Sequence, residues 1–82
     1  MYKITLDINA KRILKKLKKD EQKNILNKIR KLGEKPYLGK RLSGNLYGLW
    51  KLRLDKYRIL YQIIEHKLII VVMNITHRKK IY

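Results

Sequence analysis

Two alternating strands around a short turn constrain the fold of this chain most strongly. Residues 50–63 alternate apolar and polar side chains on both sides of the dipeptide at 55–56, a pattern typical of a β-hairpin. A two-residue loop fixes the register so that Arg53 faces Arg58. Like charges directly opposite each other destabilise an antiparallel pair. Because Lys51 lies on the same face, the hairpin predicts three clustered cations and therefore a surface that binds an anion.

The composition indicates one small domain with a polyanionic partner. The 82 residues predict a single domain, 1–82, with a modest core. Twenty-two Lys and Arg against six acids give a net charge of +16, which favours nucleic acid or an acidic protein as partner. The absence of cysteine excludes disulfides and thiolate chemistry. The longest apolar run, at 68–73, is too short to cross a membrane, and no signal peptide is evident, so we expect a cytoplasmic protein without membrane contact.

The first half of the chain predicts a strand followed by a helical hairpin. Residues 2–8 alternate like a strand with one buried face. Asn9 is the expected N-cap of a first helix and Asp20 that of a second, which Gly33 would follow at its C-terminal end. Apolar residues recur at helical spacing in both segments: Ala10, Ile13, Leu14 and Leu17, then Ile25, Leu26, Ile29 and Leu32.

The second half predicts a loop and three strands. Residues 34–48 contain the only proline and three of the four glycines, so we expect a loop there. Strands are expected at about 49–54, 57–64 and 67–75, with a second tight turn at 65–66. The predicted fold class is α+β, in the order β-α-α-β-β-β, with an antiparallel sheet and a two-helix hairpin packed on one of its faces.

Two-residue turns would sort the strand residues onto two different faces. The face expected under the helices carries no charge: Trp50, Leu52, Leu54, Ile59, Tyr61, Ile63, Leu68, Ile70 and Val72. The other face is cationic at one end and apolar at the other: Lys51, Arg53, Arg58, Leu60, Gln62, Ile69, Val71 and Met73.

The end of the chain supplies further chemistry near this cationic end. The last strand leaves the sheet at the same end as the 55–56 turn, so His77, Arg78 and Tyr82 are expected to approach the cations. Such a group suits phosphoryl chemistry, because cations stabilise a pentacoordinate phosphate and Lys, His or Tyr can move protons. Neighbouring cations also lower the pKa of a lysine, which suits Lys51 as a base. No carboxylate cluster is present in the sequence, so neither a metal nor a cofactor is expected.

Each of these side chains also has an ordinary interpretation. Lys51 and Arg53 fit solvated strand residues, His77 a surface or packed histidine, and Tyr82 an apolar anchor of the tail. Arg58 fits a purely structural role less well because of the repulsion across the strands.

Three blocks of sequence resemble a known family. They are residues 48–53, GLWKLR, residues 57–61, YRILY, and the pair at 77–78 with Tyr82. In this order they resemble the RelE branch of the RelE/ParE toxin superfamily of toxin–antitoxin systems, over essentially the whole chain. The resemblance implies an endoribonuclease (an mRNA interferase) that enters the ribosomal A site, cuts messenger RNA by attack of a ribose 2′-hydroxyl on the adjacent phosphate, and so inhibits translation.

The resemblance also implies a role for each matching residue. Lys51 matches the general base and Arg53 a phosphate contact. Arg58 and Arg78 match arginines that stabilise the phosphate and assist the leaving group, and Tyr82 matches a tyrosine on which the flanking base stacks.

The same resemblance implies partners and leaves rivals open. His77 occupies a position where some members carry a histidine implicated in proton transfer and others do not. A cognate acidic, RelB-like antitoxin is expected to mask the site of a toxin that is monomeric when free, and the ribosome and mRNA are the expected targets. The apolar end of the second face is the expected antitoxin contact. The rivals are a ParE-type toxin that poisons DNA gyrase without nuclease activity, and a plain RNA-binding module.

Overall fold

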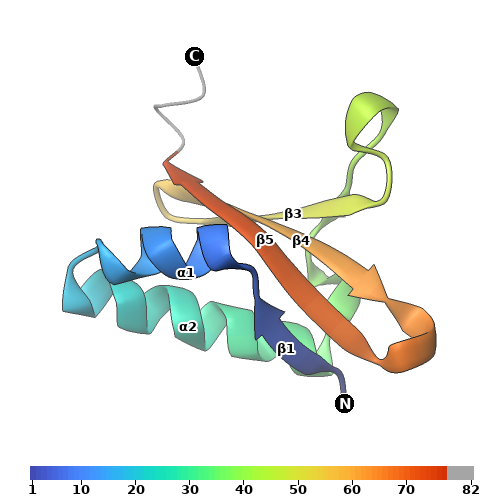
Figure 1. The fold of residues 1–82 in the computed structure, drawn as a ribbon, viewed down its shortest axis with the longest axis horizontal. Coiled ribbons are helices and arrows are strands. Elements are labelled where there is room, and N and C mark those ends of the chain that lie inside the picture. The colour runs from blue at the N-terminus through green and yellow to red at the C-terminus, as the bar shows by residue number, and fades with distance from the viewer. Residues whose placement is uncertain (78–82) are drawn as a thin grey trace.

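The chain folds into a five-stranded sheet with two helices on one face. The computed structural model describes residues 1–77. Its main elements are β1 (Lys3–Leu6), α1 (Ile8–Lys15), α2 (Lys19–Glu34), β2 (Lys40–Arg41), β3 (Leu49–Leu54), β4 (Tyr57–Ile64) and β5 (Ile69–His77). The strand order is β1-β5-β4-β3-β2, and the helices run side by side next to β1 and β5 (Figure 1). The predicted α+β class, with a helical hairpin on one face, is confirmed.

The sheet is mixed, whereas an antiparallel sheet was expected. β1 pairs in parallel with β5, with Ile4 opposite Ile70, while all other neighbouring strands are antiparallel. A short hairpin turn forces the two strands that it joins to run antiparallel. No such turn joins β1 to β5, so this pair is free to run parallel. A second difference is β2, which forms inside the segment 34–48 that was expected to be a loop and places Lys40 opposite Lys51.

The helices begin two residues earlier than their expected caps imply. Asp7 precedes α1, and its carboxylate accepts a hydrogen bond of 3.4 Å from the backbone N–H of Asn9, which lies inside the helix. Asp20 also lies inside its helix, because α2 starts after Lys18. There the Glu21 carboxylate accepts the Lys18 N–H at 3.4 Å, as in a capping box. Both predicted N-caps were therefore wrong.

Gly33 lies in the last turn of α2 and not beyond its end as expected. The N–H of Tyr2 donates to the Gly33 carbonyl at 2.8 Å, which ties the start of the chain to the helix. A Cβ atom at Gly33 would lie 3.0 Å from the Tyr2 carbonyl oxygen. The glycine therefore allows the N-terminal segment to approach the helix closely.

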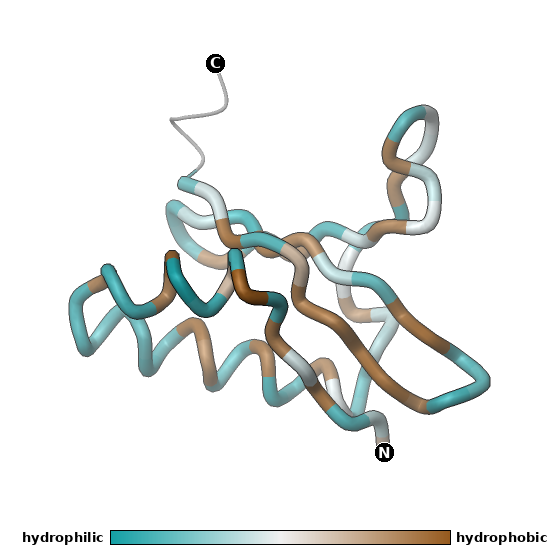
Figure 2. The backbone as a smooth tube through the Cα atoms, viewed as in Figure 1, coloured by the Kyte–Doolittle hydropathy of each residue, from teal (hydrophilic) through white to brown (hydrophobic). Residues whose placement is uncertain are grey.

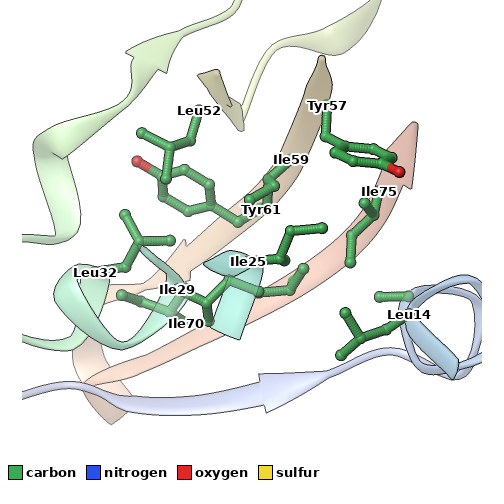
Figure 3. Packing of buried hydrophobic residues seen from close by; sticks show 12 residues of the cluster. Leu14, Ile25, Ile29, Leu32, Leu52, Tyr57, Ile59, Tyr61, Ile70 and Ile75 are labelled. Atoms are coloured by element: carbon green, nitrogen blue, oxygen red, sulfur yellow. The ribbon is translucent and has the colours of Figure 1, made fainter. Parts of the chain in front are cut away.

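The core fills the space between the helices and the sheet. Hydrophobic residues recur at intervals along both helices and run along much of β4 and β5 (Figure 2). Figure 3 shows the buried side chains of the two layers meeting. The core residues are Ala10, Leu14, Ile25, Ile29, Leu32, Leu52, Tyr57, Ile59, Tyr61, Ile70, Val72 and Ile75. The helix stripes and the alternation of β3 and β4 predicted most of this set.

A β-bulge in β5 reverses the alternation at its C-terminal end. Tyr61 pairs with Val72 but Leu60 pairs with Asn74, so Met73 is an extra residue in β5. Ile75 consequently points into the core. The face expected for every residue after Met73 is therefore inverted.

The β4–β5 turn is also longer than the two residues expected. A 3₁₀ turn at Glu65–Lys67 leads to Leu68, which has a left-handed backbone with φ of 54°. Leu68 was expected in the core and is instead exposed.

Tyr61 ties the loop before β2 to this core. The side chain is fully buried, and its hydroxyl donates to the Pro36 carbonyl and accepts the Gly39 N–H, both at 2.9 Å. These bonds fix the segment 36–39 and with it the start of β2. A buried group left without its partner costs about 1–3 kcal/mol, so the Tyr61 hydroxyl contributes directly to holding this segment in place.

Replacing Tyr61 by Phe should lower the free energy of unfolding by about 1–3 kcal/mol, because the Gly39 N–H and the Pro36 carbonyl lose their partner. Urea unfolding measures the change. Tyr47→Phe, which removes the hydroxyl of an exposed tyrosine, should change stability by no more than a few tenths of a kcal/mol. Equal stability of the two variants would show that the buried hydroxyl does not secure the segment.

Candidate functional site

A cluster of cations lies on the sheet face away from the helices. The predicted hairpin register is confirmed: Arg53 is directly opposite Arg58, and Lys51 is opposite Leu60. Lys40 adds a fourth cation, because β2 places it opposite Lys51. The sequence reasoning missed Lys40, since a two-residue strand carries no periodic pattern. Basic residues on three neighbouring strands thus form the cationic cluster: Lys40, Lys51, Arg53 and Arg58.

The cluster lacks internal neutralisation in the part of the chain that is described. Within residues 1–77, the ion pair present joins Lys56 and Glu21 at 3.1 Å, and none involves the cluster. The Lys51 pKa is lowered, first by partial removal of its ammonium group from water and then by the charges of Arg58, Arg53 and Lys40. The pKa effect that the sequence predicted for Lys51 is therefore present.

Arg58 carries a polar atom without a partner. Its Nε atom is buried and has no hydrogen-bond partner among the described residues. Buried donors are nearly always satisfied in folded proteins, and exceptions concentrate where a ligand or a catalytic role explains them. A guanidinium group suits an oxyanion partner, especially a phosphate.

A shallow pocket beside the cluster offers room for such a ligand. It has a volume of about 370 Å³ and is lined by Leu38, Gly39, Lys40, Lys51, Leu52 and Arg53. At Gly39, an added Cβ would lie 2.6 Å from the Lys51 carbonyl oxygen and 2.6 Å from the Tyr61 hydroxyl. Only glycine therefore lets the chain pass close enough to set Lys40 beside Lys51.

His77 lies on the other face of the sheet. It pairs with Tyr57, and the two rings meet edge to face at 5.5 Å and 75°. Thr76 takes the place opposite Arg58. The expectation that His77 approaches the cluster is wrong, because the bulge at Met73 shifts the alternation by one residue.

The remaining expected site residues, Arg78 and Tyr82, lie outside the described residues, so their roles remain predictions. In residues 1–77, no three His, Cys, Asp or Glu side chains gather in a group that could hold a metal ion. No helix in this range is long and apolar enough to cross a membrane. The apolar end of the cationic face is present, with half-buried side chains: Leu60, Ile69, Val71 and Met73.

Solved structures of bacterial and archaeal toxins share this fold. The toxin–antitoxin complex RelBE2 from Mycobacterium tuberculosis matches with a TM-score of 0.88 and 28% identity, over 94% of this chain and 98% of that chain. The isolated RelE toxin of E. coli matches with a TM-score of 0.80 and 22% identity, over 94% of this chain and 84% of that chain. The archaeal RelE–RelB complex from Pyrococcus horikoshii matches with a TM-score of 0.78 and 20% identity, over 96% of this chain and 97% of that chain. The last two show the fold alone. Comparison with curated protein sequences gives no match.

The family follows from the sequence match. Residues 4–82 of this chain match the sequence model of a family described as the ParE toxin of the type II toxin–antitoxin system parDE. The chain belongs to this family, and it is a toxin of the RelE/ParE superfamily. The similarity to RelE structures confirms the predicted RelE branch.

Replacing Arg58 by Leu should leave the free energy of unfolding unchanged or raise it by a few tenths to about 1 kcal/mol, because it removes repulsion across the strands. Chemical denaturation measures this change. Ile59→Ala, at the neighbouring fully buried position, should cost about 2–5 kcal/mol. A marked loss of stability in Arg58→Leu would instead show that Arg58 holds the fold together.

The Lys51 pKa should lie below the usual value near 10.5 for lysine, and Arg58→Gln should raise it, since a neighbouring positive charge is lost. An NMR titration of the lysine side chains measures both values. A base that loses its proton more easily becomes active at lower pH, so Arg58→Gln should move the alkaline rise of any Lys51-dependent activity to higher pH. Arg30→Gln, which removes a charge from the exposed surface of α2, should leave the Lys51 titration in place. An unshifted Lys51 in the native protein would remove the physical reason for its role as base.

Proposed function

We propose that this toxin is a ribosome-dependent endoribonuclease that cuts messenger RNA in the ribosomal A site without a metal ion and thereby inhibits translation. The observation that carries the proposal is the cationic cluster, which lies on a rigid sheet without an internal ion pair in residues 1–77. Strands fix these side chains more firmly than a loop would. A stability requirement alone would not favour Arg53 opposite Arg58.

The chemistry follows from the properties of the cluster. Lys51, with its lowered pKa, takes the proton from a ribose 2′-hydroxyl. The 2′-oxygen then forms a bond to the adjacent phosphorus, and the bond from phosphorus to the 5′-oxygen breaks, which leaves a cyclic phosphate on one fragment. Arg53 and Arg58 stabilise the extra negative charge of the pentacoordinate phosphate. Arg78, which matches a family arginine that assists the leaving group, would supply the proton to the departing 5′-oxygen.

Arg58 is the residue that best fits a phosphate ligand. Its buried Nε donor lacks a partner in the described part of the chain, and a phosphoryl oxygen would supply one. A charge-assisted hydrogen bond formed with the transition state contributes more to catalysis than one formed equally with the substrate. Losing one such donor costs about 10²–10³ in rate. Tyr82 is assigned to stacking on the flanking base, and the role of His77 stays open, since its ring packs on Tyr57.

The proposal includes an acidic RelB-like antitoxin as partner. Several of the related structures are complexes of a RelE toxin with its antitoxin or with an antitoxin peptide. An acidic segment with apolar anchors would match both ends of the exposed sheet face, neutralising the cations and covering the apolar side chains near Val71. The free toxin would then be a monomer that acts in the cytoplasm, where translating ribosomes are.

A second candidate function is inhibition of DNA gyrase. It is favoured by one observation, the match of residues 4–82 to a family described as ParE toxins. The basic cluster favours the nuclease, because a protein that only binds gyrase has no need of a lysine with a lowered pKa beside arginines. A non-catalytic RNA-binding module is a third reading of the same charges.

Lys51→Ala should slow cleavage of messenger RNA on translating ribosomes by about 10²–10⁴ under single-turnover conditions, as expected for loss of a general base. Primer extension on the message measures the cut. Lys23→Ala, which removes an exposed charge from α2, should cut at the native rate. Full activity of Lys51→Ala would defeat the base assignment. Intact message with the native toxin, together with inhibited DNA supercoiling by gyrase, would favour the second candidate function.

A further inference from the structure

A second hollow lies beside β2, on the opposite face of the sheet from the cationic cluster. Its volume is about 270 Å³, and its walls include Tyr37, Tyr47, Trp50, Arg41 and Glu65. Arg41 pairs with Trp50, whereas the preceding residue of β2 pairs with Lys51. Because neighbouring residues of a strand point to opposite faces, β2 contributes one cation to each surface. The loop between β2 and β3, which carries Tyr47, projects away from the two helices (Figure 1).

Trp50 forms a rigid aromatic floor for this aromatic pocket. Its ring stacks on buried Tyr61 at 6.2 Å and 24°, and Tyr37 lies against it at 5.4 Å and 51°. The Arg41 guanidinium carbon lies 5.3 Å from the centre of the Trp50 ring, a cation–π arrangement. Tyr47 at the rim is 80% exposed. A fixed ring with an exposed ring nearby suits a flat ligand that stacks.

Glu65 gives the pocket its polar selectivity. The Tyr37 hydroxyl donates to both carboxylate oxygens, at 2.7 and 2.8 Å, and the Tyr2 hydroxyl donates at 3.2 Å. Glu65 also raises the pKa of the Tyr37 phenol, which therefore keeps its proton. A carboxylate accepts but does not donate, so the free capacity of Glu65 suits the N–H groups of a nucleobase and repels a phosphate.

One cation of β2 lies at the pocket itself. Arg41 lies over Trp50, whereas Lys40, its neighbour in sequence, belongs to the cationic cluster on the other face. Base donors toward Glu65, a base ring against the exposed Tyr47 beside Trp50, and a phosphate near Arg41 would together be the contacts of one nucleotide. The net charge of +16 favours a polyanion in general, and the acid in the pocket disfavours an acidic peptide.

We propose that this aromatic pocket binds an unpaired base of single-stranded RNA, as a site separate from the cationic cluster. The choice of RNA as ligand rests on the proposed function, in which the cationic cluster cuts RNA. A strand that leaves the pocket and crosses β2 would reach Lys40 and Lys51 of that cluster. RNA recognition commonly uses splayed bases stacked on aromatic side chains and arginine. The pocket would hold RNA beside the site of cleavage and would not take part in the chemistry.

Trp50 is the only tryptophan, so its fluorescence reports binding in this pocket. Hexa-adenylate titrated into the full-length toxin, without ribosomes and at about 150 mM salt, should quench it to saturation. Tyr47→Ala should weaken binding about 5-fold to 150-fold, since stacking contributes about 1–3 kcal/mol per base, and Tyr47→Phe should restore it. Arg41→Gln should also weaken binding, whereas Arg30→Gln, an equal loss of charge on α2, should have a much smaller effect. Circular dichroism checks that each variant is folded.

Three outcomes would overturn the inference. They are an absence of saturable quenching, equal quenching by an abasic hexanucleotide of the same charge, and unchanged binding by both Tyr47→Ala and Arg41→Gln. Quenching by an acidic peptide but not by RNA would assign the surface to a protein partner instead. Because the titration contains no ribosome, it is independent of cleavage: base binding without cut message would defeat only the proposed nuclease, and cleavage without base binding would defeat only this pocket.

Discussion

The two-residue turn at 55–56 is the constraint on which the rest of the structure depends. Asp55 adopts a left-handed backbone with φ of 58°, and the turn pairs Leu54 with Tyr57. That register places Arg53 opposite Arg58 at a cost of at most about 1 kcal/mol. A slip of one residue would move the core face of either strand to solvent, and burying one residue such as Ile59 contributes about 1.5–3 kcal/mol. The core therefore holds the arginines together against their repulsion.

The parts of the fold that local periodicity controls were predictable. Both helices, the hairpin and its two faces follow from spacings of 3.6 and 2.0 residues, and they agree with the structure apart from the helix ends. The parallel pairing of β1 with β5 was not predictable in this way, because it joins residues far apart in sequence. Neither was the bulge at Met73, since neither Gly nor Pro marks it.

The candidate site was likewise predictable only where local alternation of side chains controls it. Lys51, Arg53 and Arg58 came from alternation within one hairpin, and their placement is confirmed. Lys40 was missed because β2 exists only through its pairing with β3. The placement of His77 failed because it required counting alternation across the bulge. Local patterns locate side chains within a hairpin, whereas a single extra residue elsewhere in the sheet changes the face on which a side chain lies.

Tyr61 links the two surfaces that carry the proposals. Its ring supports Trp50 on the aromatic side, and its hydroxyl fixes Gly39, which precedes the cation that β2 sets beside Lys51. Because the whole side chain is buried, neither contact depends on a mobile surface group. The two-residue strand β2 is held by its pairing with β3, and the Tyr61 hydroxyl fixes the segment that leads into it. One core residue thus helps to fix the position of the cationic cluster and of the aromatic pocket. An RNA strand that crosses the sheet edge would therefore find the two sites at a fixed distance and orientation from each other.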